Sequence, residues 1–335
     1  MSILVTGAAG FIGSHVVKFL LARGETVVGI DNLNAYYDPT LKDARLESIG
    51  TPRGFTFEKM DFSDRAAMDD LAKRHRFDGI VHLGAQAGVR HSITNPHDYV
   101  DANLVGHLNL LELSRHQEVA HMVYASSSSV YGGNTKLPFS VADRVDHPIS
   151  LYAATKRANE LMSESYTHLY RVPMTGLRFF TVYGPWGRPD MAMWIFAKAM
   201  FAGESIRLFN KGKMRRDFTY VDDIVAGVVA CLDRPPADDG SVKPGGSAGP
   251  HSIHNIGNNH PEDIETLIAI LERETGREAR IELAEMQPGD VPATYADIDA
   301  FHAVTGFRPA TSLVDGVHKF IRWYADYHDI ALPKD

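Results

Sequence analysis

The sequence predicts an α/β protein built on a doubly wound parallel sheet, with a smaller mixed α/β lobe in its C-terminal half. Over residues 1–120, short apolar strands alternate with amphipathic helices, the pattern of a parallel sheet covered by helices on both faces. A glycine-rich turn, GAAGFIG at 7–13, joins the first strand to the first helix. Beyond Gly184 the alternation gives way to irregular loops and shorter elements.

The strands are predicted where short apolar or β-branched runs lie between turn-forming residues. Buried parallel strands read as continuous apolar runs because helices cover both faces of the sheet. The run at 252–256 occurs late in the chain, and we expect it to return to the sheet. The expected strands are Ile3–Thr6, Thr26–Asp31, Phe55–Asp61, Ile80–Gly84, Met122–Ser126, Met174–Phe180, Ile206–Phe209 and Ser252–Ile256.

The helices are predicted where apolar residues recur three or four positions apart, as Ile12, Val16 and Leu20 do. The helix that starts at Asp222 has an acidic first turn, which suits the helix dipole. The stretch 235–250 is rich in Pro, Gly, Asp and Ser, which indicates an exposed, mobile loop. The expected helices are Phe11–Ala22, Met68–His75, Tyr99–Gln117, Tyr152–Tyr170, Ala192–Ala202, Asp222–Leu232, Glu262–Thr275 and Leu313–His328.

Composition excludes several classes of protein. The 335 residues are 44% hydrophobic and 23% charged, the balance of a cored globular protein. The net charge of −8 and the absence of a long basic run argue against nucleic acid or a membrane as partner. Cys231, the one cysteine, lies in an apolar run and fits a buried residue in a reducing cytoplasm. The N-terminal residues lack signal-peptide features and no apolar run is long enough to span a membrane, so we expect neither export nor insertion.

The glycine-rich turn predicts a dinucleotide site. Gly7, Gly10 and Gly13 provide a tight turn, close backbone approach to a pyrophosphate, and helix amides aimed at negative charge, although the spacing differs from G-x-G-x-x-G. Asp31 ends the second strand, where a carboxylate binds a ribose diol and repels a 2′-phosphate, so NAD is predicted rather than NADP. The alternative is an ordinary strand-to-helix turn with Asp31 as a turn cap. Further contacts to NAD are expected from Phe11, Ile12, Asn32, Asp61, Phe62, Leu83, Gly84 and Ala85.

Tyr152 and Lys156 form a Tyr-x-x-x-Lys pair on one face of a predicted helix. For the phenol to act as a base, its pKa must fall from about 10 to near 7, and the adjacent ammonium and an oxidised nicotinamide favour that fall. The serine run at 126–129 ends the preceding strand, and we expect Ser127 to bridge a substrate hydroxyl to the phenol. The alternatives are a solvated surface pair and a polar loop. Tyr152 and Lys156 are therefore expected to serve both catalysis and cofactor binding.

Metal and nucleophilic chemistry are not predicted. The chain has 16 histidines but no His-Glu-x-x-His, and His251-x-x-His254 has no cysteine partner. No nucleophile elbow accompanies a Ser-His-Asp set. Hydride transfer remains as the reaction class.

These motifs together resemble the extended short-chain dehydrogenase/reductase family, the nucleotide-sugar epimerases and dehydratases with a Rossmann-type domain. Within that family the chain is similar to the UDP-glucuronate 4-epimerases, and the likeness covers essentially its whole length. The matching segments are DNLNAYYDPTLKDARL (31–46), GAQAGVRHSITNP (84–96), SSSSVYGGN (126–134), RFFTVYGPWGRPDMA (178–192), RRDFTYVDDIV (215–225) and QPGDV (287–291).

The resemblance implies NAD-dependent C4 epimerisation of UDP-glucuronic acid to UDP-galacturonic acid, through a 4-keto sugar that keeps its carboxylate. It makes Ser127 the catalytic Ser/Thr, Tyr152 the base and Lys156 the ligand of the nicotinamide ribose. Arg216 would bind the diphosphate, Asp290 the uridine ribose, and Phe209 and Met191 would line the uracil. We expect the sugar carboxylate to be met by Ser128, Ser129 and Thr181, with charge from Arg188 or Arg90.

Several departures bear on the reaction. Sugar dehydratases of this family carry an Asp-Glu pair where this chain has Ser128 and Ser129, so elimination is not expected. Glucuronate decarboxylases carry Glu before the Val-Tyr-Gly sequence, where Ser129 stands here, and galactose epimerases carry Arg in place of Gln287. A decarboxylase, a UDP-glucose 4-epimerase and an NAD-sensing binding module remain as alternatives.

The resemblance also implies a division of the chain. Residues 1–183 are expected to form the NAD-binding Rossmann domain, with 218–258 returning to it. Residues 184–217 and 259–335 are expected to form the lobe that binds the UDP-sugar. The two long helices predicted at 99–117 and 152–170 resemble the pair through which this family forms homodimers.

Overall fold

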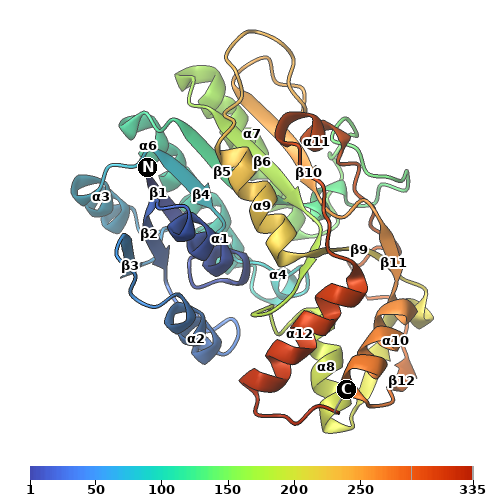
Figure 1. Cartoon of the computed structure of the whole chain (residues 1–335). Helices are drawn as coiled ribbons and strands as arrows, with labels where there is room; N and C mark the ends of the chain where they lie inside the picture. The colour runs from blue at the N-terminus through green and yellow to red at the C-terminus, as the bar shows by residue number, and fades with distance from the viewer. Residues whose placement is uncertain (288, 334–335) are drawn as a thin grey trace.

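The computed structural model describes residues 1–287 and 289–333, and its centre is a seven-stranded sheet (Figure 1). Every neighbouring pair of strands in this sheet is parallel. The strand order reverses between β1 and β4, which is where a doubly wound sheet binds its ligand. The predicted return of residues 252–256 is confirmed, because β10 pairs with β6 at the edge. In spatial order the strands are β3 (Phe55–Lys59), β2 (Thr26–Asp31), β1 (Ser2–Thr6), β4 (Gly79–His82), β5 (His121–Ser127), β6 (Met174–Phe179) and β10 (His251–Ile256).

Helices cover both faces of the sheet because side chains alternate along each strand. Ile3 of β1 packs in the same apolar cluster as Val16 of the first helix, whereas Leu4 packs on the opposite face with Leu110. Figure 1 shows α1 and α9 side by side across one face. That face carries α1 (Phe11–Ala22), α2 (Pro39–Ile49) and α9 (Val221–Leu232), and the other carries α3 (Arg65–Arg74), α6 (His107–Gln117) and α7 (Leu151–Tyr170).

The helix predicted over Tyr99–Gln117 is interrupted. Two short helices, α4 (His91–Thr94) and α5 (Pro96–Tyr99), lead into a π-helical segment at Val100–Gly106, and α6 follows. The turn of a π-helix is wider than that of an α-helix, and a hydrophobic pattern with a 3.6-residue period does not reveal it. The sequence therefore predicted one continuous helix here. The wider turn lies where buried Asn103 contacts the loop after β4.

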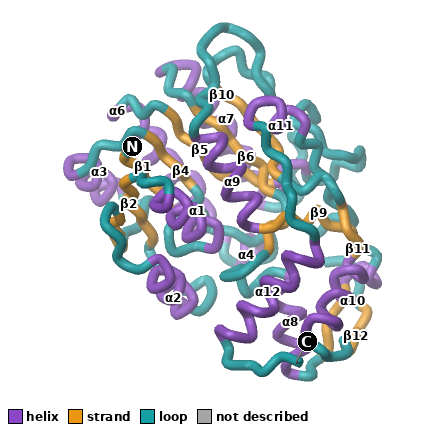
Figure 2. The backbone as a smooth tube through the Cα atoms, viewed as in Figure 1, coloured by secondary structure: helices purple, strands orange, loops and turns teal. Residues whose placement is uncertain are grey.

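The smaller lobe lies beyond the carboxyl edge of the sheet, where Figure 2 shows its helices and short strands grouped together. Two small sheets, β11-β9-β7 and β12-β8, form its strands. The helix predicted from Glu262 begins two residues later, because Glu262 pairs with Arg216 in an antiparallel ladder. The elements of the lobe are β7 (Thr181–Tyr183), α8 (Ala192–Ala202), β8 (Ser205–Leu208), the 3-10 turn Phe209–Gly212, β9 (Arg215–Tyr220), β11 (Pro261–Asp263), α10 (Ile264–Thr275), β12 (Arg280–Leu283) and α12 (Leu313–Tyr327). Two further elements belong to the sheet domain: the 3-10 turn Ser128–Tyr131 follows β5, and α11 (Asp299–Thr305) packs against β10 and α9 (Figure 1).

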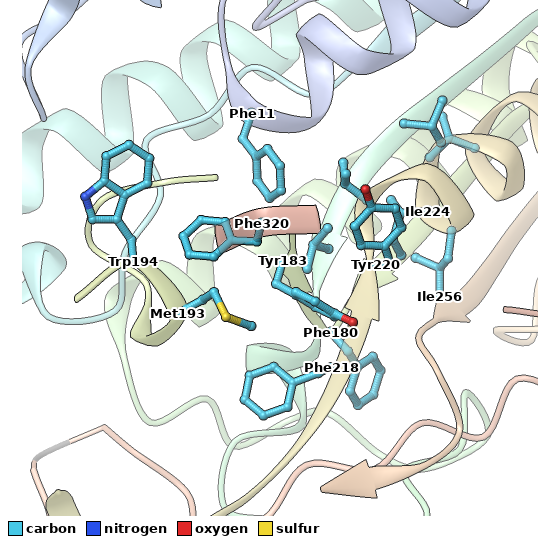
Figure 3. Close-up of a cluster of buried hydrophobic side chains, with 14 of the residues drawn as sticks. Phe11, Phe180, Tyr183, Met193, Trp194, Phe218, Tyr220, Ile224, Ile256 and Phe320 are labelled. Carbon is cyan, nitrogen blue, oxygen red and sulfur yellow. The ribbon is translucent and has the colours of Figure 1, made fainter. Parts of the chain in front are cut away.

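One apolar cluster joins the lobe to the sheet. Figure 3 shows Phe11 of α1 near Phe320 of α12 and Trp194 of α8. Phe218 and Tyr183 pack edge to face in the same cluster, with ring centroids 6.1 Å apart. Because this core is continuous from α1 to the lobe, the lobe is held against the carboxyl ends of the strands.

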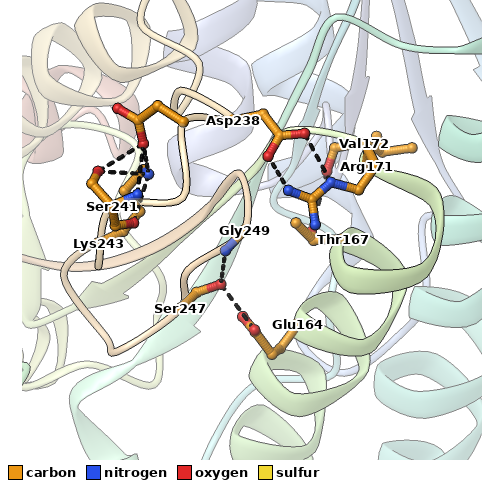
Figure 4. A network of polar contacts seen from close by, with 10 residues as sticks. Glu164, Thr167, Arg171, Val172, Asp238, Ser241, Lys243, Ser247 and Gly249 are labelled. Carbon is orange, nitrogen blue, oxygen red and sulfur yellow. Dashed lines mark hydrogen bonds and ion pairs between the residues drawn. The ribbon is translucent and has the colours of Figure 1, made fainter.

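The stretch 235–250 forms no helix or strand, but it is tied to α7 rather than free (Figure 4). Arg171, after the end of α7, donates hydrogen bonds from Nε and Nη2 to the two oxygens of Asp238, the first over 2.8 Å. Ser247 donates to Glu164 over 2.9 Å. The composition therefore predicted the lack of regular structure correctly and missed these anchors. Within residues 1–287 and 289–333 no helix is long and apolar enough to cross a membrane.

Candidate active site

The glycine turn after β1 has the shape that a dinucleotide pyrophosphate requires. Gly7 has φ +69°, and a Cβ on it would lie 2.9 Å from the Gly84 Cα. A Cβ on Gly13 would overlap the Gly7 carbonyl oxygen, which itself accepts the Gly10 N–H over 2.8 Å. No side chain caps α1, so the first amides of the helix remain open to an anion. Side chains on these glycines would fill the turn, and this fits a bound pyrophosphate.

Asp31 lies at the end of β2 beside this turn and is 7% exposed. Its carboxylate accepts the Ala9 N–H over 3.2 Å and the Leu33 N–H over 2.9 Å, so the turn-cap alternative describes part of its bonding. The Lys42 ammonium lies 3.8 Å from the same carboxylate, and burial lowers the pKa of Lys42. Asp31 is thus held rigidly where the ribose diol was predicted.

The ends of the next strands complete the same edge. Asn32 donates to Asp61 over 2.8 Å, and the Thr6 hydroxyl accepts the Gly84 N–H over 2.9 Å. The Phe62 ring lies so close to Gly84 that a Cβ there would come within 2.7 Å of it. The structure therefore brings the predicted cofactor residues together at the carboxyl ends of β1 to β4. These are Gly7, Gly10, Phe11, Ile12, Gly13, Asp31, Asn32, Asp61, Phe62, Leu83, Gly84 and Ala85.

The Tyr-x-x-x-Lys pair lies in the first two turns of α7, facing the end of β5. Lys156 is 3% exposed, and its Nζ donates to the Ala125 carbonyl oxygen over 2.9 Å. Burial lowers the pKa of Lys156 to about 8. Ser127, which ends β5, accepts the Ser129 N–H over 3.1 Å and interacts with the Tyr152 phenol. Lys156 is thus locked under the serine run, and Ser127 lies beside Tyr152.

The surroundings of Tyr152 in the chain alone act on its pKa in opposing directions. Burial raises the pKa of the phenol, and the Ser127 hydroxyl and the Arg188 charge oppose this rise. The charge of Asp190 raises it further. Burial disfavours the phenolate, and the Lys156 ammonium is engaged by a carbonyl oxygen. The predicted fall also requires an oxidised nicotinamide, so it stays a prediction for the complex with NAD.

A buried ion pair supports the serine run from below. Glu160, one turn after Lys156, accepts two hydrogen bonds from Arg178 over 2.8 and 2.9 Å. Ser126 donates to the same carboxylate over 2.6 Å. The ends of β5 and β6 are therefore fixed to α7 by charged hydrogen bonds.

The loop after β7 brings a cation, Arg188, beside Tyr152. Arg188 donates to both oxygens of Asp190, over 2.9 Å from Nε and 2.7 Å from Nη2. Tyr36, which follows β2, donates to Asp190 over 3.0 Å. The loop is tied to the glycine turn by Arg45, which donates to the carbonyl oxygens of Ala9 over 3.1 Å and Trp186 over 2.8 Å.

The predicted uridine and diphosphate contacts cluster elsewhere, between the loop after β4 and the lobe. Arg90 donates to Asp290 over 3.1 Å, and its guanidinium lies 4.9 Å from the Phe209 ring centroid. Burial lowers the pKa of Arg216, with the Asp290 charge opposing it. Arg90 and Arg188, both proposed for the carboxylate, therefore occupy different places, and Arg188 is the one beside Tyr152. Pro288 of the QPGDV segment lies outside the described residues.

Other predicted residues lie around the same opening. Ser128 and Ser129 form the 3-10 turn after β5, and Thr181 starts β7 opposite Phe218. Met191 precedes α8, with its sulfur 3.8 Å from Arg188 Nη2. Four residues that contact the site were not predicted from the sequence: Tyr36, Arg45, Asn103 and Asp190. All except Asn103 lie in segments that resemble the family. Among residues 1–287 and 289–333 no group of three or more His, Cys, Asp or Glu is arranged to hold a metal ion.

Asn103 shows why structure was needed to find such residues. Its Oδ1 accepts the Gln86 N–H over 2.9 Å, and its Nδ2 donates to the Gln86 carbonyl oxygen and the Thr155 hydroxyl, each over 3.1 Å. Asn103 thereby joins the loop after β4 to the helix that carries Tyr152. The only sequence signal is a polar residue in an apolar helical pattern.

Comparison with known proteins agrees with this geometry. A probable UDP-glucuronate 4-epimerase of Rhizobium meliloti is 46% identical over 97% of both chains. The UDP-glucuronic acid 4-epimerase of Bacillus cereus, solved with UDP-glucuronic acid and NAD, is 33% identical with a TM-score of 0.86, over 98% of this chain and all of that one. The UDP-glucose 4-epimerase of Thermotoga maritima, solved with UDP-glucose, is 29% identical with the same TM-score and coverage. The model of the NAD dependent epimerase/dehydratase family matches residues 3–243, and the chain belongs to that family.

Proposed function

We propose that this protein is an NAD-dependent isomerase that interconverts UDP-glucuronic acid and UDP-galacturonic acid at C4. The observation that carries the proposal is the Arg188 guanidinium beside the Tyr152 phenol, because it places a cation for a sugar carboxylate next to the base. The Rhizobium meliloti and Bacillus cereus relatives, which bear this activity in their names, support the same substrate.

NAD fits the edge formed by β1 to β4. The amides at the start of α1 would hold its pyrophosphate, and Asp31 its adenosine ribose. Lys156 and Tyr152 would contact its nicotinamide ribose. Bound there, NAD would supply a reversible hydride acceptor for C4 of the sugar.

The chain's own groups move the proton. Tyr152, with Ser127 beside it, removes the proton of the sugar 4-hydroxyl and later returns it to the 4-keto oxygen. The phenolate form requires a lower pKa than burial sets in the chain alone, and a positively charged nicotinamide bound nearby would lower it. Because the hydride returns to the opposite face of C4, the reaction has no net redox change.

The lobe would hold the nucleotide while the sugar turns. We propose that Arg216 and Arg90 bind the diphosphate, that Phe209 and Met191 line the uracil, and that Asp290 binds the uridine ribose. Rotation about the diphosphate linkage then presents the other face of the 4-keto sugar. In this proposal 1–183 with 218–258 serve NAD, and 184–217 with 259–335 serve the UDP-sugar.

Retention of the carboxylate needs its own groups. A 4-keto uronic acid loses CO₂ readily when its C5–C6 bond aligns with the carbonyl π system. The hydroxyls of Ser128, Ser129 and Thr181, together with Arg188, are the groups proposed to hold the carboxylate out of that alignment.

The proposal extends to assembly and compartment. Leu161 and Leu169 of α7 are 55% and 62% exposed, and Val105 of the π-helical segment and Leu108 of α6 are 43% and 40% exposed. An apolar face of this kind on neighbouring helices supports a homodimer through α6 and α7. Cys231 is free and buried, which fits a cytoplasmic protein.

The product of the purified protein with UDP-glucuronic acid and NAD tests the proposal. We expect UDP-galacturonic acid, identified by mass and NMR. Release of CO₂ with a UDP-pentose would make the protein a decarboxylase, and turnover of UDP-glucose in preference would make it a glucose epimerase. If NAD binds but no UDP-sugar gives a product, the protein would instead be an NAD-sensing binding module.

A further inference from the structure

Asp190 and Tyr36 form the immediate surroundings of Arg188, and neither belongs to the predicted site. Asp190 takes two of the five guanidinium N–H groups, those on Nε and one on Nη2. Nη1 makes no hydrogen bond with any of the described residues. One edge of the guanidinium is therefore fixed by Asp190. On the other edge, Nη2 has only the weak Met191 sulfur contact, over 3.8 Å, and Nη1 is available to a ligand.

Tyr36 in turn fixes Asp190. The Tyr36 hydroxyl donates to Asp190 Oδ2 over 3.0 Å, and its ring lies against His91 with centroids 4.8 Å apart. Gly88 lies so close that a Cβ on it would overlap the Tyr36 hydroxyl. Both oxygens of Asp190 are thus engaged, and neither Asp190 nor Tyr36 can turn freely.

The charges of this cluster reach the base. Arg188 lowers the pKa of Tyr152, Asp190 raises it, and the side chains of Arg188 and Asp190 are only 26% and 30% exposed. Arg188 and Asp190 are partly solvated, so screening by water reduces their charge interactions with Tyr152 without abolishing them. The groups that interact with Tyr152 are Ser127 from β5, Tyr99 at the end of α5, Arg188 and Asp190 from the loop after β7, and Tyr36 after β2. Lys156 lies one turn further along the same helix, where its ammonium donates to the Ala125 carbonyl oxygen.

Epimerisation sets two opposing demands on Arg188. A carboxylate must be recognised, yet it must leave its first position when the 4-keto sugar turns. A bare guanidinium would hold one orientation too firmly, whereas a guanidinium already shared with Asp190 attracts the carboxylate less.

We propose that Asp190, oriented by Tyr36, is a positioning residue that aims the free edge of Arg188 at the sugar carboxylate and tempers its charge, so that the site selects a uronic acid without trapping one orientation of the ring. This inference rests on the proposed function and assigns the determinant of its specificity.

The test compares Asp190→Asn and Tyr36→Phe with matched controls far from the site. Asp233→Asn breaks another Arg–Asp pair, with Arg23 at 2.8 and 3.0 Å. Tyr166→Phe removes another tyrosine–carboxylate bond, to Glu112 at 2.7 Å. Both controls should keep the affinities and rates of the unaltered protein.

Two measurements are made with UDP-glucuronic acid and UDP-glucose: Kd by calorimetry in the presence of NAD, and kcat across pH. Asp190→Asn should tighten UDP-glucuronic acid roughly tenfold and leave UDP-glucose unchanged, while kcat for UDP-glucuronic acid falls. The acid limb of kcat should move to lower pH, because the group that raises the pKa of Tyr152 is gone. Tyr36→Phe should move that limb to higher pH. Asp190 keeps its negative charge but loses the hydrogen bond that Tyr36 donates, so its charge raises the pKa of Tyr152 further.

Equal changes in Kd for both sugars, or acid limbs that move in the same direction in both variants, would show a merely structural role and overturn the inference. The Kd ratio reports on Asp190 even if no epimer is formed. Failure of the unaltered protein to produce UDP-galacturonic acid overturns the proposed function instead, so the two failures are distinguishable.

Discussion

The Lys156 ammonium donates its hydrogen bond to the Ala125 carbonyl oxygen over 2.9 Å, so α7 is fixed to β5 directly below Ser127. Lys156 is nearly inaccessible, and burial lowers its pKa from 10.5 to about 8. Below pH 8 the lysine is charged in both the folded and the unfolded chain, and the folded chain carries the full cost of burying it. Between pH 8 and 10.5 the folded chain releases the proton first, and its stability rises with pH.

Lys156→Met makes this effect measurable. Relative to that variant, the free energy of unfolding of the unaltered protein should increase by about 3 kcal/mol from pH 7 to pH 10.5. Urea unfolding of both proteins without NAD, at several pH values, gives the difference directly. A difference that stays constant with pH would contradict the buried, destabilised ammonium.

Tyr152→Phe should remove the base and little else. Turnover of UDP-glucuronic acid should fall by about a thousandfold, whereas NAD should still bind, since the ring and its edge contact with Tyr99 at 6.0 Å are kept. Single-turnover kinetics measure the loss of activity, and an NAD titration measures the retained binding. Activity within tenfold of the unaltered protein would remove Tyr152 from the proposed mechanism.

Glu160→Gln tests the ion pair beneath the serine run. The variant leaves the Arg178 guanidinium buried without a countercharge, which costs about 3–5 kcal/mol of stability. Glu282→Gln, which alters an exposed carboxylate paired with Arg207 at 3.5 Å, is the matched control and should change stability by less than about 1 kcal/mol. Urea unfolding at pH 7 compares the two, and similar losses would argue that the buried pair has no special role.

Local patterns predicted most of the sheet, because each parallel strand is a continuous apolar run and each covering helix has one apolar face. The predicted cofactor residues also lie together, since they follow the ends of strands that meet at one edge. Strand β9 was missed, because its residues RRDFTY are charged at one end and its partners β7 and β11 have only three residues each. The pairing of β9 with β7 and β11 joins distant parts of the chain, and the spacing of residues along the sequence does not indicate it.

The residues that hold Arg188 and its loop in place could not be predicted from the sequence, for a related reason. The bond from Tyr36 to Asp190 joins residues 154 positions apart, and Arg45 reaches Trp186 across 141 positions. Nothing in the local sequence distinguishes these residues from an ordinary surface tyrosine, aspartate or arginine. Only the packing of α2 against the loop after β7 reveals what they hold.

Gly13→Ala should damage the glycine turn. The new methyl group would overlap the Gly7 carbonyl oxygen, so the turn must shift and the amides of α1 lose their alignment. We expect NAD to bind at least about tenfold more weakly, a loss of about 1.4 kcal/mol. Calorimetric titration with NAD measures it. Gly133→Ala, where an added methyl group meets nothing within 4 Å, is the control and should bind NAD normally.

Asp31→Ser should shift the cofactor preference towards NADP. The carboxylate at the end of β2 repels a 2′-phosphate, while the Lys42 ammonium, 3.8 Å from it, would attract one. With Asp31 removed, that ammonium loses its nearest countercharge, and the ratio of NADP to NAD affinity should rise at least about tenfold. Adding Lys42→Met to Asp31→Ser should abolish most of the gain, because the cation nearest to the phosphate is then gone, while the Arg45 guanidinium stays bound to the carbonyl oxygens of Ala9 and Trp186. If the single and double variants show the same ratio, Lys42 plays no part, and the discrimination against NADP comes from the shape of the pocket rather than from this pair of charges.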